Sequence, residues 1–375
     1  MPSRSNQRVT HLAPLEEVYA FIDAVARPVE PREVAVSQAS GRVLAADAVV
    51  AAPAPARALA LRDGWAVASE RVADAGPYAP APLAPPPAWV ECGEALPGGA
   101  DAVLAPDAVA LTDGVAEALA AASAGDHVLT VGLDADPRVP LCKAGARLRP
   151  TDLAAMQAVG IERVWTRVPR ARVVSTAPDR RGASDFVGGL IARAVEGEGG
   201  AAILEAGADA SALARLLAED GCDVILTVGG TGMGRRDASV STLAQVGHLA
   251  MHGIGVRPGD SAALGTVESR PVLQLPGRLD AALSAWLVVG RRLLARLAAR
   301  GAAEDGVPVR LARKVVSTIG LAEVVPVGYC EGGVEPLASE YFPLRSLTCA
   351  AGWILVPPES EGFPLGAMVA LQPFP

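Results

Sequence analysis

The stretch DVILTVGGTGMGRRD, residues Asp223 to Asp237, decides the fold class, because an apolar run ends directly in a glycine-rich loop. The apolar run is typical of a buried strand, and glycine lets the backbone adopt positive φ and approach a ligand closely. A glycine-rich turn between a parallel strand and a helix presents backbone N–H groups and the positive end of the helix, and both favour phosphate. The stretch therefore predicts a strand, a ligand-binding loop and a helix in succession.

This loop has two interpretations. It lacks the Gly-Lys-Ser/Thr of a Walker loop and the G-x-G-x-x-G spacing of a dinucleotide-binding loop, so it is either a tight turn that needs glycine for steric reasons or a site for an anion or metal-bound anion. The two arginines and the aspartate that follow favour the second. The expected phosphate-binding residues are Gly229, Gly230, Thr231, Gly232 and Gly234. Asp237 is expected to cap the helix or to hold Mg²⁺.

Strand and helix patterns alternate on both sides of this stretch, from residue 170 to residue 300. The predicted strands are ARVVST (171–176), AAILEAG (201–207), DVILTVGG (223–230) and VLQLPG (272–277). The predicted helices are SDFVGGLIARAVE (184–196), ASALARLLAED (210–220), DASVSTLAQVG (237–247) and a long one over 279–300. Such alternation predicts a parallel sheet with helices on both faces, and ligands of these sheets bind outside the carboxyl ends of the strands.

Three further turns are expected at the same edge. In RPGDS (257–261), Arg257 suits phosphate through its forked donors, or it pairs with Asp260 on the surface, and spacing alone leaves both open. In LPGR (275–278), Arg278 is placed to face the same crevice. The turn 175–185 carries Asp179, Arg180, Arg181 and Asp185. Together these turns predict a local positive field.

The flanking regions have other patterns. Residues 13–26 predict a helix with apolar Leu15, Val18, Phe21, Ile22 and Val25, and residues 41–50 predict a strand. The region from Ala51 to Pro87 is rich in Pro and Ala and predicts a small inserted β-rich lobe, and short strands and turns are expected over 88–111. A helix is expected from Thr151, with Thr151 or Asp152 as its N-cap. Residues 307–375 have short apolar runs and no helical period, which predicts a small β-barrel or sandwich.

Composition restricts the class of protein. The 375 residues are 51% hydrophobic and have a net charge of −8, which argues against a nucleic-acid or membrane-surface binder. The five cysteines form no CxxC, so neither disulfides nor structural zinc are expected. No apolar leader or membrane span is found, and we expect a cytoplasmic protein. His248 and His252 fall in a predicted strand, where spacing of four does not favour a metal pair.

Several motifs, taken in order, resemble the molybdopterin molybdenumtransferase family, the MoeA and gephyrin E-domain group, across nearly the whole chain. They are ASGRVLAADAVVAAPAPARALALRDGWAV (39–67), GEALPGGADAVLAPD (93–107), PRARVVSTAPD (169–179), DVILTVGGTGMGRRD (223–237) and LQLPGRLDAALSAW (273–286). They are similar to that family's Met-Asp-Gly-Tyr-Ala, Gly-Ala-Asp-Ala-Val, Ser-Thr-Gly-Asp-Glu, Gly-Gly-x-Ser-x-Gly-x-x-Asp and Leu-Pro-Gly-Asn-Pro segments.

The resemblance implies four domains: a split elongated domain (1–50 plus 126–168), a β-rich inserted lobe (51–125), a MogA-like doubly wound α/β domain that binds molybdopterin (169–303) and a C-terminal β-barrel (304–375). It also implies a cytoplasmic homodimer, with other molybdenum cofactor biosynthesis proteins or molybdoenzymes as candidate partners.

The implied reaction inserts molybdate into adenylylated molybdopterin with release of AMP and with the help of Mg²⁺. The implied catalytic residues are Asp63, Asp179 and Arg257, with Asp63 supplied by the partner subunit. Asp237 and Asp179 are the implied metal ligands. Pro258, Gly259, Pro276, Gly277 and Arg278 join the glycine loop in binding the cofactor.

The chain departs from the family pattern at several of these positions. The segment Lys-Pro-Gly-Lys-Pro becomes Arg-Pro-Gly-Asp-Ser, so Asp260 stands where a second cation is usual, and Gly232 and Arg278 replace the serine and asparagine of their motifs. A negative charge there weakens oxyanion binding. The sequence therefore supports a molybdenum insertase and, as alternatives, a divergent homologue that carries a pterin or nucleotide-like anion without catalysis, or an enzyme acting on another such anion.

Overall fold

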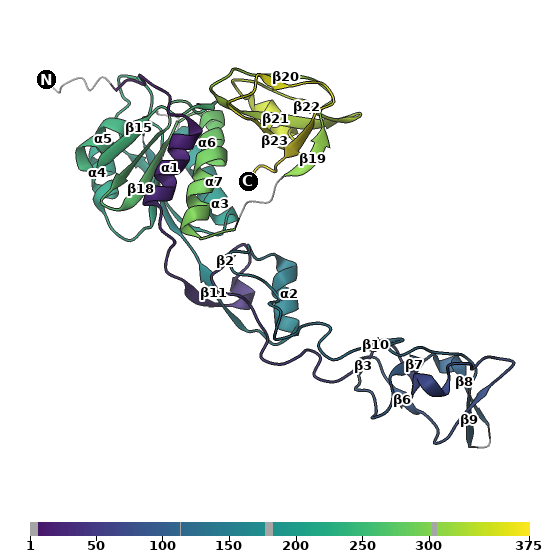
Figure 1. The fold of residues 1–375 in the computed structure, drawn as a ribbon. Coiled ribbons are helices and arrows are strands. Elements are labelled where there is room, and N and C mark those ends of the chain that lie inside the picture. The colour runs from purple at the N-terminus through teal and green to yellow at the C-terminus, as the bar shows by residue number, and fades with distance from the viewer. Residues whose placement is uncertain (1–6, 113, 177–182, 302–305) are drawn as a thin grey trace.

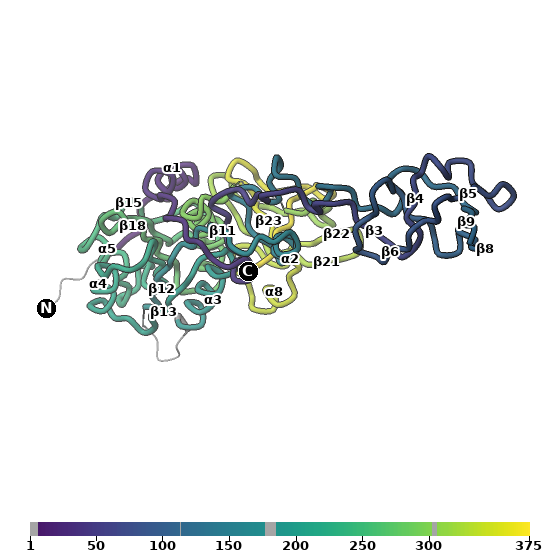
Figure 2. The backbone as a smooth tube through the Cα atoms, turned by 90° about the horizontal axis from the view of Figure 1, so that it is seen from below, coloured from purple at the N-terminus to yellow at the C-terminus, as the bar shows by residue number. Residues whose placement is uncertain are grey.

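The computed structural model describes residues 7–112, 114–176, 183–301 and 306–375. The molecule is elongated: an α/β domain and a C-terminal β domain lie side by side at one end, and a β-rich lobe lies at the other (Figure 1). A narrow middle part joins the two ends, and the view from below in Figure 2 shows the same separation.

A six-stranded sheet with the order β13-β12-β14-β18-β17-β15 forms the α/β domain. Its strands are β12 (Arg170–Thr176), β13 (Ala201–Ala208), β14 (Val224–Val228), β15 (His248–His252), β17 (Ala263–Val267) and β18 (Arg270–Leu275). The first four in the sheet order pair in parallel, which confirms the doubly wound core. β17 and β15 run antiparallel, so the expectation of a wholly parallel sheet is wrong at that edge. The cause is a tight turn at Glu268 (φ 55°), which folds β17 directly back into β18.

Helices cover both faces of this sheet, as predicted. α4 (Ala210–Ala218) and α5 (Ser239–Val246) pack into one apolar core. α3 (Ala183–Gly197) packs into the other core together with the long helical segment that follows β18. The loops between strands and helices are thereby collected at the ends of the sheet.

Residues 279–297 form one helical segment, which confirms most of the helix predicted over 279–300. α6 (Leu279–Ala285) and α7 (Arg291–Leu297) are joined by a π-helical turn, η4 (Trp286–Gly290). A Cβ on Gly290 would lie 2.3 Å from the Trp286 ring, so glycine lets the buried indole pack directly against the helix.

Helix α1 (Leu15–Val25) forms where the apolar spacing predicts it. Its buried residues Leu15, Val18 and Ile22 belong to the same core as α3, α6 and α7, and α1 contacts α7 and β18. Helix α1, which falls within the segment 1–50 of the expected split domain, thus packs on the α/β domain.

The middle part is built on a three-stranded antiparallel sheet. Its strands are β1 (Arg32–Ala35), β11 (Arg163–Arg167) and β2 (Val43–Leu44), so the strand predicted over 41–50 is much shorter than expected. Helix α2 (Pro150–Ala158) packs beside it. Its N-cap is Arg149 rather than Thr151 or Asp152, because Pro150 takes the first helical position and the Asp152 carboxylate accepts from the Arg149 N–H at 2.8 Å.

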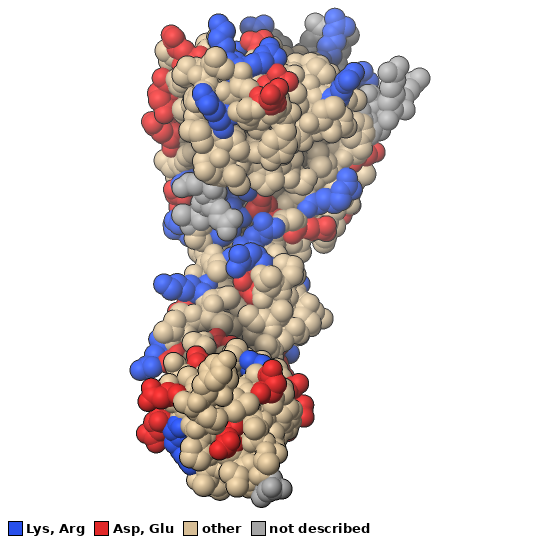
Figure 3. Space-filling model, turned by 90° about the vertical axis from the view of Figure 1, so that its right-hand side faces the viewer, with Lys and Arg blue, Asp and Glu red and all other residues tan. Residues whose placement is uncertain are grey.

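The distal lobe contains short strands with two small apolar cores, in agreement with a β-rich insertion. The strands are β3 (Leu59–Ala60), β4 (Gly64–Val67), β5 (Ala81–Leu83), β6 (Ala88–Val90), β7 (Ala102–Leu104), β8 (Val109–Thr112), β9 (Val115–Ala118) and β10 (Val128–Leu129). Residues 51–125 include nine Asp and Glu residues but three arginines. Figure 3 shows carboxylates over this lobe, whose charge is opposite to that needed for an anionic ligand.

The C-terminal domain is built on strands and one short helix. The strands are β19 (Val307–Arg310), β20 (Val315–Val316), β21 (Ala322–Cys330), β22 (Gly333–Pro336), β23 (Gly352–Val356), β24 (Gly362–Phe363) and β25 (Met368–Leu371). The helix α8 (Leu344–Cys349) corrects the expectation that this region is free of helix. Strand β16 (Val256–Arg257), which follows β15, pairs in parallel with β21 and joins this domain to the α/β domain.

Two further features concern the cysteines and the helices. All five cysteines carry free thiols. Among the described residues, no helix has both the length and the apolar character needed to cross a membrane.

Candidate functional site

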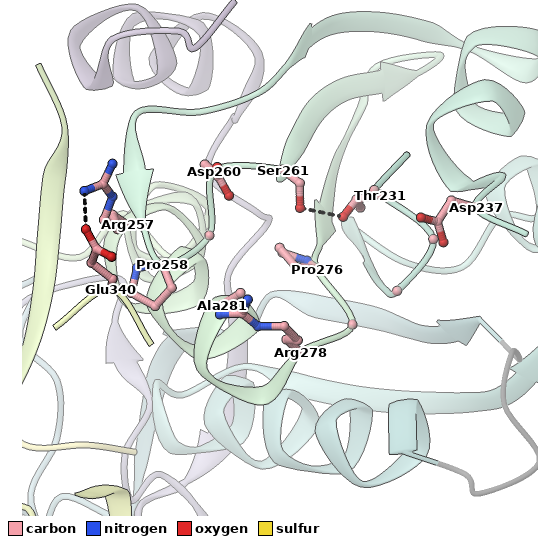
Figure 4. Close-up of a pocket in the computed structure, with 15 residues that line it drawn as sticks. Thr231, Asp237, Arg257, Pro258, Asp260, Ser261, Pro276, Arg278, Ala281 and Glu340 are labelled. Carbon is pink, nitrogen blue, oxygen red and sulfur yellow. Dashed lines mark hydrogen bonds and ion pairs between the residues drawn. The ribbon is translucent and has the colours of Figure 1, made fainter. Parts of the chain in front are cut away.

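A pocket of about 640 Å³ lies at the carboxyl ends of β14 and β18 (Figure 4). Eleven of the predicted site residues line it: Gly229, Gly230, Thr231, Gly232, Asp237, Arg257, Pro258, Gly259, Pro276, Gly277 and Arg278. They come together because carboxyl ends of neighbouring parallel strands meet at one edge of a sheet, and β16 brings the 257–261 turn to the same edge.

The glycine loop needs glycine for both conformation and space. Gly229 and Gly230 have φ of 98° and 71°, a region that side chains rarely adopt. A Cβ on Gly230 would lie 2.3 Å from Ser239 Oγ, and one on Gly229 would lie 2.7 Å from Thr176 Oγ1. The steric requirement and the ligand-binding interpretation are therefore both compatible with this loop.

Side chains from outside the loop hold three consecutive loop carbonyls. Gln7 Nε2 donates to the carbonyl oxygens of Gly230 at 2.8 Å and Gly232 at 2.7 Å, and His252 Nε2 donates to that of Thr231 at 2.9 Å. Because a carbonyl only accepts, His252 carries its proton on Nε2. Within the described residues, the amides of Gly230, Thr231 and Gly232 have no acceptor, so these N–H groups are available to an anion.

Asp237 belongs to the loop rather than to the helix that follows. Its Oδ2 accepts from the Gly234 N–H at 2.9 Å, and the N-cap of α5 is Ala238, so the expected helix-capping role of Asp237 is wrong. Gly234 thus supports the site through Asp237, although it does not line the pocket. The Asp237 carboxylate remains at the pocket edge, where one oxygen is free of protein donors among the described residues.

Arg257 lines the pocket at its junction with the C-terminal domain. Its Nη1 donates to Glu340 Oε1 at 3.1 Å and to Thr318 Oγ1 at 3.4 Å. The pairing with Asp260 that the sequence left open is therefore not formed. Asp260 lines the pocket separately (Figure 4).

Arg278 is also paired with a carboxylate. It donates to both oxygens of Asp280, at 3.0 and 2.7 Å, and Asp280 is only 3% exposed. This bidentate hydrogen bond raises the pKa of Arg278 above its ordinary value. The Arg278 guanidinium also lies 5.2 Å from the ring centre of Tyr341, a cation–π distance.

The site also contains four residues that the sequence patterns do not predict there: Gln7, His252, Asp280 and Glu340. Gln7 and Glu340 come from opposite ends of the chain, in segments without any pattern that marks a ligand site. His252 falls in a strand, β15, and its ring supports the loop through the Thr231 carbonyl. Asp280 alone had a local indication, because it follows Arg278 by two residues at the start of α6.

One predicted site residue, Asp63, does not line the pocket within one chain. Asp63 lies between β3 and β4 of the distal lobe, which is at the other end of the molecule from β18 (Figure 1). Its Oδ1 accepts from the Cys92 N–H at 2.8 Å. Asp179, with Arg180 and Arg181, lies outside the described residues. Asp185, in the first turn of α3, accepts from Ser175 Oγ at 2.8 Å.

Comparison with known proteins gives consistent results. Residues 13–160 match the model of the MoeA N-terminal region, domains I and II, and residues 189–296 match that of a probable molybdopterin binding domain. A crystal structure of a molybdopterin biosynthesis MoeA protein from Pyrococcus horikoshii aligns with 97% of this chain and 100% of its own, with a TM-score of 0.72 and 25% identity. A second structure of a MoeA protein from Pyrococcus horikoshii OT3 has a TM-score of 0.76 over 96% of this chain and 100% of its own, and its 21% identity supports the fold alone.

A curated relative matches a smaller part. A protein of Methanocaldococcus jannaschii that is assigned by name to molybdopterin biosynthesis is 30% identical over 149 residues. The match covers 39% of this chain and 35% of that protein, so it spans about a third of the length of the relative.

Proposed function

Because the chain belongs to the MoeA family of molybdopterin biosynthesis proteins, we propose that it inserts molybdate into adenylylated molybdopterin and releases AMP. The observation that carries this proposal is the pocket at the sheet edge, which is lined both by loop residues with unpaired amides and by two arginines. An adenylylated pterin brings a phosphate, and molybdate is itself a tetrahedral oxyanion, so both ligands need such donors.

Each group has a distinct task in this proposal. The amides of Gly230 to Gly232 bind phosphate oxygens and stabilise the charge that develops when the bond to AMP breaks. Their orientation is fixed in advance by Gln7 and His252, which hold the loop carbonyls. Arg257 and Arg278 orient the anions from the opposite side of the pocket.

The residues present suit a Mg²⁺ ion that is bound by one protein carboxylate together with substrate phosphate and water. Among the described residues, no group of three or more His, Cys, Asp or Glu side chains is arranged to hold a metal. Mg²⁺ usually binds through one or two carboxylates together with water and substrate phosphates, and Asp237 offers one such carboxylate beside the phosphate loop. A bound Mg²⁺ would neutralise phosphate charge. Asp179, outside the described residues, is the proposed second ligand.

The proposed active form is a homodimer. Asp63 of each chain would then complete the pocket of the partner subunit, since its own lobe lies at the far end of the molecule. Other molybdenum cofactor biosynthesis proteins or molybdoenzymes are the proposed partners, and the cytoplasm is the proposed compartment.

A second candidate function is favoured by the charge of the pocket. Three carboxylates, Asp237, Asp260 and Glu340, line it against two arginines, Arg257 and Arg278. This balance disfavours a free oxyanion and favours a carrier that holds the pterin without inserting molybdate.

The test measures pterin binding, AMP release and the rescue of a strain that lacks its molybdenum insertase. The purified protein is incubated with adenylylated molybdopterin, molybdate and Mg²⁺, and pterin binding and AMP are measured; in parallel the gene is expressed in a strain that lacks its molybdenum insertase. AMP release with rescue supports the insertase. Binding without AMP release supports the carrier, above all if Asp260→Lys then creates activity. Failure to bind the pterin and to release AMP rejects both.

A further inference from the structure

One segment of the C-terminal domain, residues 339–342, contacts the charged groups of the pocket with three consecutive residues. Glu340 accepts from Arg257 at 3.1 Å, the Tyr341 ring lies 5.2 Å from the Arg278 guanidinium, and the Phe342 N–H donates to Asp280 Oδ2 at 3.2 Å. Figure 4 shows Glu340 and Arg257 side by side at one end of the pocket. This segment therefore supplies part of the immediate surroundings of both Arg257 and Arg278.

The backbone of Glu340 is held in an unfavourable conformation by a buried carboxylate. Its φ of 62° is uncommon for a residue other than glycine. Glu323, which is 1% exposed, accepts from Ser339 Oγ at 2.6 Å and from the Glu340 N–H at 3.2 Å. Glu323 lies directly opposite Arg257 in the pairing of β21 with β16. The strained residue is thus fixed beside the arginine with which it pairs.

We propose that Glu340 determines the anion specificity of the pocket by occupying Arg257 until a tetrahedral oxyanion displaces its carboxylate. This inference rests on the proposed function, because it takes Arg257 as part of the anion site. A carboxylate and a phosphate or molybdate oxygen accept the same guanidinium donors, so they compete for Arg257. A ligand must replace the internal pair, which selects for strong, multiply charged anions over weak ones.

The geometry makes this exchange feasible. The Glu340 side chain is 72% exposed, whereas that of Arg257 is 30% exposed. Glu340 contacts Arg257 through one oxygen and one nitrogen, so the pair is not the bidentate arrangement that Arg278 makes with Asp280. An exposed pair of this kind is weak, and the carboxylate can move into solvent while Glu323 keeps the backbone in place.

The experiment compares anion binding by two variants. Glu340→Gln removes the charge at constant size, and Glu340→Gly also relieves the positive φ. Calorimetric titration with inorganic pyrophosphate and, separately, with molybdate is expected to show affinities about fivefold higher for both variants at low salt, with a smaller gain at high salt. Glu335→Gln is the control, since Glu335 pairs with Arg313 in the same domain away from the pocket.

The outcomes separate this proposal from the proposed function. A gain for pyrophosphate alone assigns the Glu340 position to the phosphate, and a gain for molybdate alone assigns it to the inserted oxyanion. Unchanged affinities in both variants, with weaker binding in Arg257→Ala, overturn the role of Glu340 and leave the anion site intact. If Arg257→Ala binds both anions as the wild type does, the proposed anion site itself is wrong.

Discussion

The side-chain amide of Gln7 donates a hydrogen bond of 2.7 Å to the carbonyl oxygen of Gly232, across 225 residues of sequence. The same amide also binds the Gly230 carbonyl, and its oxygen accepts from the Ser241 N–H at 3.2 Å. Gln7 therefore links Gly230 and Gly232 of the glycine loop to the start of α5, and the loop amides owe their orientation partly to it.

We predict that Gln7→Ala weakens pyrophosphate binding by roughly fivefold or more, because each lost hydrogen bond contributes about 1 kcal/mol. Gln7→Glu is expected to bind more weakly still, since its carboxylate faces two carbonyl oxygens. Calorimetric titration measures both effects, and Gln157→Ala, on the exposed face of α2, is the matched control. Equal affinities in all four proteins would show that the loop is ordered without Gln7.

The second prediction distinguishes backbone strain at positive φ from steric contact of an added side chain in the glycine loop. Gly230→Ala forces a side chain into positive φ and places a methyl group 2.3 Å from Ser239 Oγ. We expect a loss of about 2 to 4 kcal/mol in the free energy of unfolding, together with loss of anion binding.

Gly221→Ala is the matched control, because Gly221 also has positive φ but its added Cβ would meet no atom within 4 Å. Its expected cost is about 1 to 2 kcal/mol, from backbone strain alone. Urea unfolding measures both variants. A Gly230→Ala protein as stable as Gly221→Ala would contradict the close contact with Ser239.

Much of the α/β domain follows from the sequence because its information is local. Local sequence is enough to predict the apolar strand before Gly229 and the turns at Arg257 and Arg278. In a parallel sheet the carboxyl ends of the strands lie at the same edge, so these turns are expected to lie together. The hairpin between β17 and β18 departs from the predicted parallel sheet, because a two-residue turn at Glu268 leaves no room for the crossover that parallel strands need.

The counter-charges of the site were not predictable in the same way. Glu340 lies 83 residues after Arg257 and reaches it only because β21 pairs with β16. A pattern within one segment cannot reveal such a partner. The charge balance of the pocket is therefore a property of how two domains meet, and the sequence indicated it only through Asp260.

The third prediction concerns the proposed homodimer. Asp63 follows β3 in the distal lobe, whereas Arg257 belongs to β16, which pairs with β21 at the other end of the molecule (Figure 1). A site that uses both residues therefore draws them from two chains. Asp63→Asn and Arg257→Ala are each expected to abolish AMP release. Mixed after unfolding and refolding together, they should recover about a quarter of wild-type activity, because half of the dimers are hybrids with one intact site.

The control places both substitutions in the same chain. That double variant, mixed with Asp63→Asn, provides no intact site and should recover nothing. If hybrids form, as tagged chains would show, but activity stays absent, then Asp63 does not act in the partner's pocket.

The fourth prediction concerns stability in acid. Glu198, at the end of α3, accepts from Arg291 at 2.7 Å and from Arg300, and its side chain is 11% exposed. Burial raises the pKa of Glu198, but Arg291, Arg300 and Arg147 together outweigh it, and the pKa lies below the ordinary 4.5. A lowered folded-state pKa contributes stability that is complete above the unfolded value and is lost as the pH falls through the folded value.

Glu198→Gln should therefore cost about 3 kcal/mol near neutral pH, since it leaves two mostly buried arginines without their carboxylate. The difference from wild type should stay constant down to about pH 4.5 and shrink below it as Glu198 takes up its proton in the wild type. Urea unfolding across this pH range measures the difference, with Glu196→Gln, exposed on the same helix, as the control. A difference that stays constant far below pH 4.5 would contradict the titration of Glu198 in this range, and no difference at any pH would contradict its role in joining α3 to α7.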